Sequence, residues 1–171
     1  MNSVRERLIA ALEIAADALD RGERYEWGHV GRCAVGHVVQ RLASMSDREI
    51  FAAFERTVGQ WREHAAEFFD AAVGDEPLAA TESQGEWCAT AGKPLAEIYR
   101  LFHAAGVDSA AIGHMEFLSD PRVLAEIPPP KRWKLRRSDP HDAALYLRTY
   151  ARVLRAERKS SGSQKHFSES A

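Results

Sequence analysis

The sequence predicts an all-α fold, a compact bundle of about six to seven helices followed by a disordered C-terminal tail. Capping boxes recur where apolar stripes begin, and apolar residues repeat at spacings of three and four. Alternation with a period of two residues is never sustained, which argues against strands. A chain of 171 residues is expected to hold one helical domain, here residues 1–159, with the tail at 160–171.

The first predicted helix opens at the capping box of Ser3 and Glu6 and ends before Gly22. A second apolar stripe runs over Val30–Leu42, after an entry that contains several glycines. Ser46 starts another capping box, and the long stripe behind it predicts a helical stretch to residue 72 with a kink or break near Gly59.

Residues 74–92 show no clear period and are read as a long connection with a helical turn around Trp87. Start signals at proline or aspartate then predict four further helices. They cover Pro94–Ala105, Asp108–Phe117, Pro121–Ile127 and a last helix that begins at Asp139-Pro140. The polar composition after Lys159 predicts the disordered tail.

Composition and local sequence indicate a cytoplasmic protein. The N-terminal segment carries charges throughout and lacks the apolar core of a signal peptide, and no apolar run approaches the length of a membrane span. The two cysteines, Cys33 and Cys88, are therefore expected to be thiols. Neither a Cys-x-x-Cys pair nor a glycine-rich nucleotide loop is present, so we expect no metal site and no cofactor.

Charge is distributed unevenly along the chain. Residues 131–171 hold 11 Lys and Arg against 4 Asp and Glu, whereas the first 130 residues hold 12 against 21. Such a split marks either a basic surface for an anionic partner or a basic C-terminal helix packed on an acidic body. We favour the intramolecular interpretation, because most charge clusters are solvated faces of the same molecule.

The most unusual segment is Tyr25–His37, which combines aromatic, glycine, histidine and cysteine residues. Each glycine in a helix costs about 1 kcal/mol relative to alanine, so glycines here suggest close approach of a helix or a ligand. We therefore expect a domain that binds a protein or a small molecule, with Tyr25, Trp27 and Arg32 as ligand-binding residues.

An alternative function is a thiol-dependent hydrolase or transferase that uses Cys33. A cysteine near a helix start is placed where the helix dipole stabilises a thiolate. His29 and His37 each lie four positions away, so either is a candidate base. The competing interpretation is a buried thiol that packs as a small apolar group.

A third function is nucleic-acid binding through the basic segment Lys131–Arg137, whose cations are suited to phosphates. The preceding helix pair is joined by a glycine turn, as in helix-turn-helix proteins. Its second helix, however, carries no Arg, Lys, Asn or Gln at residues 109–116 to read bases. The nucleic-acid interpretation is therefore disfavoured.

Overall fold

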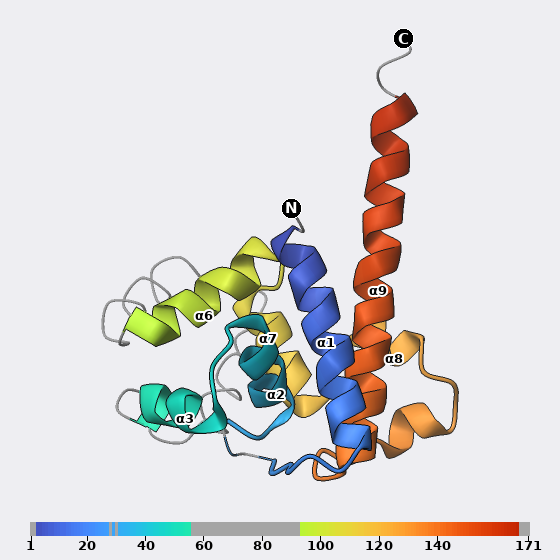
Figure 1. The fold of residues 1–171 in the computed structure, drawn as a ribbon. Coiled ribbons are helices and arrows are strands. Elements are labelled where there is room, and N and C mark those ends of the chain that lie inside the picture. The colour runs from blue at the N-terminus through green and yellow to red at the C-terminus, as the bar shows by residue number, and fades with distance from the viewer. Residues whose placement is uncertain (1–2, 28, 30, 56–92, 168–171) are drawn as a thin grey trace.

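We describe the protein from a computed structural model, which covers residues 3–27, 29, 31–55 and 93–167. Within these ranges the chain is helical and contains no strand, which confirms the predicted all-α fold (Figure 1). The elements are α1 (Val4–Asp20), α2 (Ala34–Leu42), α3 (Asp47–Glu55), α6 (Lys93–Ala104), α7 (Ser109–Phe117), α8 (Pro121–Ala125), a 3₁₀ helix η1 (Lys131–Lys134) and α9 (Pro140–Phe167).

Helices α1 and α9 form the centre of the fold. They run side by side in opposite directions, and α9 extends beyond the N-terminal end of α1 (Figure 1). Leucines and alanines at spacings of three and four face the partner helix, because these positions share one side of a helix. The fully buried side chains at this contact include Leu8, Leu12, Leu19, Leu147 and Leu154.

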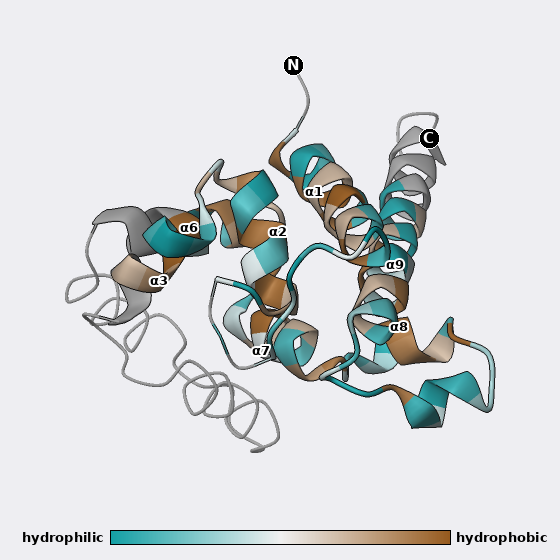
Figure 2. Ribbon diagram, turned by 60° about the horizontal axis from the view of Figure 1, so that its bottom comes forward, coloured by the Kyte–Doolittle hydropathy of each residue, from teal (hydrophilic) through white to brown (hydrophobic). Residues whose placement is uncertain are grey.

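The remaining helices pack on two sides of this pair. Helix α2 contacts α1, α3 and α7, while α6 contacts α1 and α3. The short helix α8 lies on the opposite side, against α9 (Figure 1). Figure 2 shows that the stretch around η1 is hydrophilic and lies at the edge of the molecule. These layers bury one continuous apolar cluster that reaches from α1 to α9 and α7.

The oppositely charged parts of the chain form ion pairs with each other within the molecule. Basic side chains of α9 pair with acidic side chains of α1 along the length of the contact, as the intramolecular interpretation expects. The pairs are Arg148 with Asp17 and Asp20, Arg155 with Glu13, and Arg158 with Glu6. All of these side chains are partly exposed, so each pair contributes little to stability. Together the pairs neutralise positive charges on the face of α9 that lies against α1.

Several boundaries differ from the sequence pattern. Helix α2 begins at Ala34, later than the apolar stripe suggests, because Cys33 has extended backbone angles and acts as its N-cap. Helix α9 continues to Phe167, past the expected end of the domain at Lys159, because no proline interrupts its backbone hydrogen bonds. The expected kink near Gly59 and the connection at 74–92 lie outside the described residues.

None of the helices in the described part of the chain is both long and apolar enough to cross a membrane.

Candidate functional site

The segment Tyr25–His37 leads from α1 into α2 and packs against the start of α3. A Cβ atom on Gly31 would lie 2.4 Å from the carbonyl oxygen of Asp47, so only glycine allows the two backbones to approach this closely. The Arg32 Nε atom donates to Asp47 Oδ2 at 2.9 Å, and Gln40 Nε2 donates to the Gly31 carbonyl at 2.8 Å. Gly31 and Arg32 therefore serve packing, and Arg32 is already engaged by a carboxylate.

Cys33 is fully buried at the N-cap of α2. Its Sγ atom accepts a hydrogen bond from the Gly36 N–H at 3.4 Å. Burial raises the pKa of the Cys33 thiol, and the charge of the Glu116 carboxyl raises it further. These contacts favour the neutral thiol, whereas a nucleophile needs an accessible thiolate.

The two candidate histidine bases direct their ring nitrogens to other groups. His37 Nε2 lies 3.0 Å from the Arg24 carbonyl oxygen, and its Nδ1 lies 3.2 Å from Arg41 Nη1. Burial lowers the pKa of His37, which keeps the ring neutral. His29 Nδ1 accepts from the Gly31 N–H at 3.2 Å. The ionisable side chain whose charge acts on the Cys33 thiol is instead Glu116.

Glu116 is the residue that the sequence reasoning missed. It is fully buried on α7, although charged side chains are almost never buried without partners. The signal was its position as the only acidic residue within the mostly apolar helix Ser109–Phe117. Its carboxyl also lies close enough to the half-buried Tyr25 to raise the pKa of that phenol, after burial itself as the larger cause.

Tyr25 and Trp27 meet the end of the basic segment at the surface. The Tyr25 hydroxyl donates to the Arg137 carbonyl oxygen at 2.6 Å. The Arg137 guanidinium carbon lies 4.8 Å from the ring centroid of Phe117 and 5.8 Å from that of Trp27. The two rings meet edge to face, 6.4 Å apart. We name Tyr25, Trp27, Phe117 and Arg137 the Trp27 patch; its rings are half-buried and Arg137 is exposed.

Comparisons with protein-family models, with curated proteins and with solved structures found no match.

Most cations of the segment Lys131–Arg137 are used within the molecule. Lys131 pairs with the buried carboxylate of Asp142, and Arg136 pairs with Asp139. The Arg132 guanidinium donates to two backbone carbonyls that follow α8 or lie at its end, at 2.9 and 2.6 Å. Few cations then remain for phosphates, which weighs against nucleic-acid binding. Trp133 is 73 % exposed within this segment.

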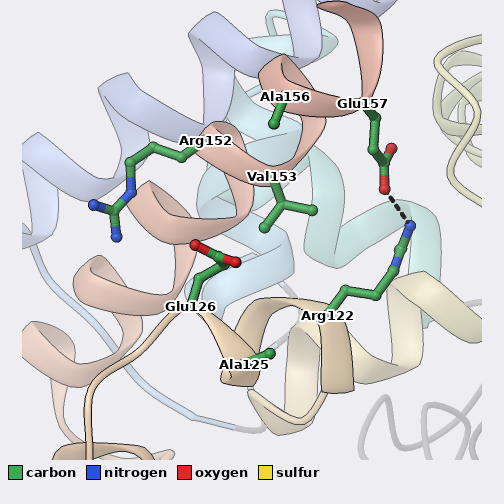
Figure 3. A pocket seen from close by; sticks show the side chains of 7 residues that line it. All are labelled: Arg122, Ala125, Glu126, Arg152, Val153, Ala156 and Glu157. Carbon is green, nitrogen blue, oxygen red and sulfur yellow. Dashed lines mark hydrogen bonds and ion pairs between the residues drawn. The ribbon is translucent and has the colours of Figure 1, made fainter. Parts of the chain in front are cut away.

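A separate open groove of about 780 Å³ lies between α8 and α9 (Figure 3). Val153 and two alanines supply apolar surface, and Arg122, Glu126, Arg152 and Glu157 supply charges of both signs. The Arg122 guanidinium is held by Glu157 at 2.8 Å and by Asp120 at the same distance. The groove is therefore balanced in charge, and it gives no preference for a particular ligand.

No three histidine, cysteine or acidic side chains gather as a metal site among the residues that the structure describes.

Proposed function

We propose that this protein is a binding domain that captures a segment of a protein partner on the Trp27 patch. The observation that carries the proposal is the meeting of two segments distant in sequence, Tyr25–His37 and Lys131–Arg137, at one partly exposed aromatic surface. Tyrosine and tryptophan are among the residue types that most often dominate the energy of protein interfaces.

The setting of the patch supports this role. Trp27 and Phe117 are half-buried, so their rings are held by the fold while part of each faces solvent. A rigid aromatic anchor loses little conformational entropy when a partner binds. The Cys33 thiol, by contrast, is sealed inside the core, and this supports binding over thiol chemistry.

The proposal is tested by selecting phage-displayed peptides on the folded protein and measuring their affinity for two variants. We expect selected peptides to lose at least about tenfold in affinity on Trp27→Ala, because a central aromatic anchor contributes more than 1.4 kcal/mol. Trp133→Ala is the matched control, since that tryptophan is exposed and is not part of the Trp27 patch. Thermal unfolding verifies that both variants are folded.

Two outcomes would contradict the proposal. One is a selection that yields no binding peptide. The other is a set of peptides that bind Trp27→Ala as tightly as they bind the unaltered protein.

A further inference from the structure

The side chain of Arg137 lies over the ring faces of the Trp27 patch. Its guanidinium lies over Phe117 and Trp27, and within the described residues no carboxylate lies at ion-pair distance from it. The neighbouring Arg136 behaves differently, because it pairs with Asp139 and Asp142. Arg137 is also exposed to solvent, so its side chain is free to leave the rings without unpairing a buried charge.

Aromatic rings attract cations because the face of each ring carries the negative end of its quadrupole. Both rings lie within reach of one cation, because the Arg137 guanidinium carbon is 4.8 Å from the Phe117 centroid and 5.8 Å from the Trp27 centroid. The buried carboxyl of Glu116 precedes Phe117 directly in the chain and lies close to Tyr25. Nothing in the patch other than Arg137 is basic.

We propose that Trp27 and Phe117 form a binding site for a cationic side chain of the partner, either an arginine or a methylated lysine, and that Arg137 occupies this site until the ligand displaces it. This inference rests on the proposed function, and it adds the chemical class of the ligand and the means of regulation.

The backbone contact of Arg137 makes the exchange local. The Tyr25 hydroxyl bonds to the carbonyl oxygen of Arg137 and not to its side chain. The guanidinium therefore leaves the rings by rotation of the side chain, while the main chain stays in place. A tethered group competes with a free ligand at an effective concentration that is often millimolar, so Arg137 weakens the apparent affinity of the ligand.

The test uses three acetylated pentapeptides of the form Gly-Gly-X-Gly-Gly, in which X is arginine, trimethyllysine or glutamine. Binding is followed through the indole N–H resonance of Trp27, which is assigned with Trp27→Phe. We expect the two cationic peptides to shift this resonance and the glutamine peptide to leave it unchanged. Arg137→Gln removes the competing cation and keeps the carbonyl, so it is expected to bind the arginine peptide roughly fivefold more tightly.

Lys134→Gln is the matched control. It removes the same charge from the same segment, but Lys134 lies over neither ring. The affinity of this variant for the arginine peptide should therefore equal that of the unaltered protein. Arg137→Lys is a second variant that retains a cation with weaker stacking, and we expect an intermediate affinity. Phe117→Ala should abolish the gain seen in Arg137→Gln. Thermal unfolding establishes that each variant is folded.

The outcomes separate this inference from the proposed function. Equal or weaker binding to Arg137→Gln, or to Arg137→Lys if the glutamine variant does not fold, would overturn the role of Arg137 as a competitor. If selected peptides bind at Trp27 but cationic peptides do not, the ligand class is wrong and the function stands. Preference for acidic peptides that require Arg137 would also overturn the inference, because Arg137 would then be a recognition group.

Discussion

At the scale of single residues, Cys33 is the buried N-cap of α2. Its sulfur caps α2 by accepting the Gly36 N–H, and burial together with Glu116 raises the pKa of its thiol. An N-cap side chain satisfies one backbone N–H that the helix cannot pair by itself. The same position that suggested a nucleophile therefore serves to begin a helix.

Cys33→Ala should lower the free energy of unfolding by about 1 kcal/mol, because alanine cannot accept the Gly36 N–H. Cys33→Ser should change it by less than about 0.5 kcal/mol, since the serine hydroxyl accepts the same bond. Urea unfolding of both variants measures the difference. An equal loss in the two variants would show that the cap contributes nothing.

At the scale of elements, the contact between the segment before α2 and the start of α3 depends on Gly31. The site of its missing Cβ is occupied by the backbone of Asp47, and backbone atoms cannot move aside as a flexible side chain can. The Arg32–Asp47 pair and the Gln40 bond to the Gly31 carbonyl then hold α3 against this segment. Close backbone approach explains why a glycine stands where a helix former would be expected.

Gly31→Ala is accordingly expected to lower the free energy of unfolding by about 1–3 kcal/mol, the usual cost of overpacking. Gly22 provides the control, because a Cβ there meets no atom within 4 Å and its φ of +88° is tolerated by asparagine. Gly22→Asn should therefore lose less stability than Gly31→Ala in the same denaturation assay. If Gly31→Ala is as stable as the unaltered protein, this contact is not close-packed in solution.

At the scale of the whole molecule, a polar network joins three helices. The nearly buried Asp120 caps α8 and receives the Arg122 guanidinium, with contacts at 2.8 and 3.2 Å. Arg122 also forms an ion pair with Glu157 of α9, and Glu157 forms a second ion pair with Arg5 of α1 at 2.6 Å. Tyr146 Oη accepts the Asp120 N–H at 3.0 Å. The chain thus links the first and last helices through α8.

This network predicts an acid-dependent stability. Burial by itself would raise the pKa of Asp120, but the hydrogen bonds and charge of Arg122 outweigh it and hold that pKa below its usual 3.8. Because the folded pKa is the lower one, the stabilisation is complete above the unfolded pKa and is lost as the pH falls through the folded value.

Arg122→Gln should therefore cost about 1–2 kcal/mol at pH 7, a value reduced for the partial exposure of Arg122. The difference from the unaltered protein should shrink below about pH 4, where Asp120 becomes protonated in the unfolded chain. Urea unfolding of both proteins at pH 7 and at a pH below about 4 measures this change. A difference that is the same at both values would show that the ion pair is not its source.

The sequence by itself predicted the all-α fold and the starts of several helices, because capping boxes and apolar spacing act within a few residues of the chain. Ser3 and Asp108 accept hydrogen bonds at the helix starts that their sequence positions predict. It also marked Tyr25, Trp27 and the basic segment as unusual. Only the tertiary structure decided which residues these segments contact. Glu116, Phe117 and Arg137 reach Cys33 and Trp27 across about a hundred residues of chain, and no local pattern encodes such contacts.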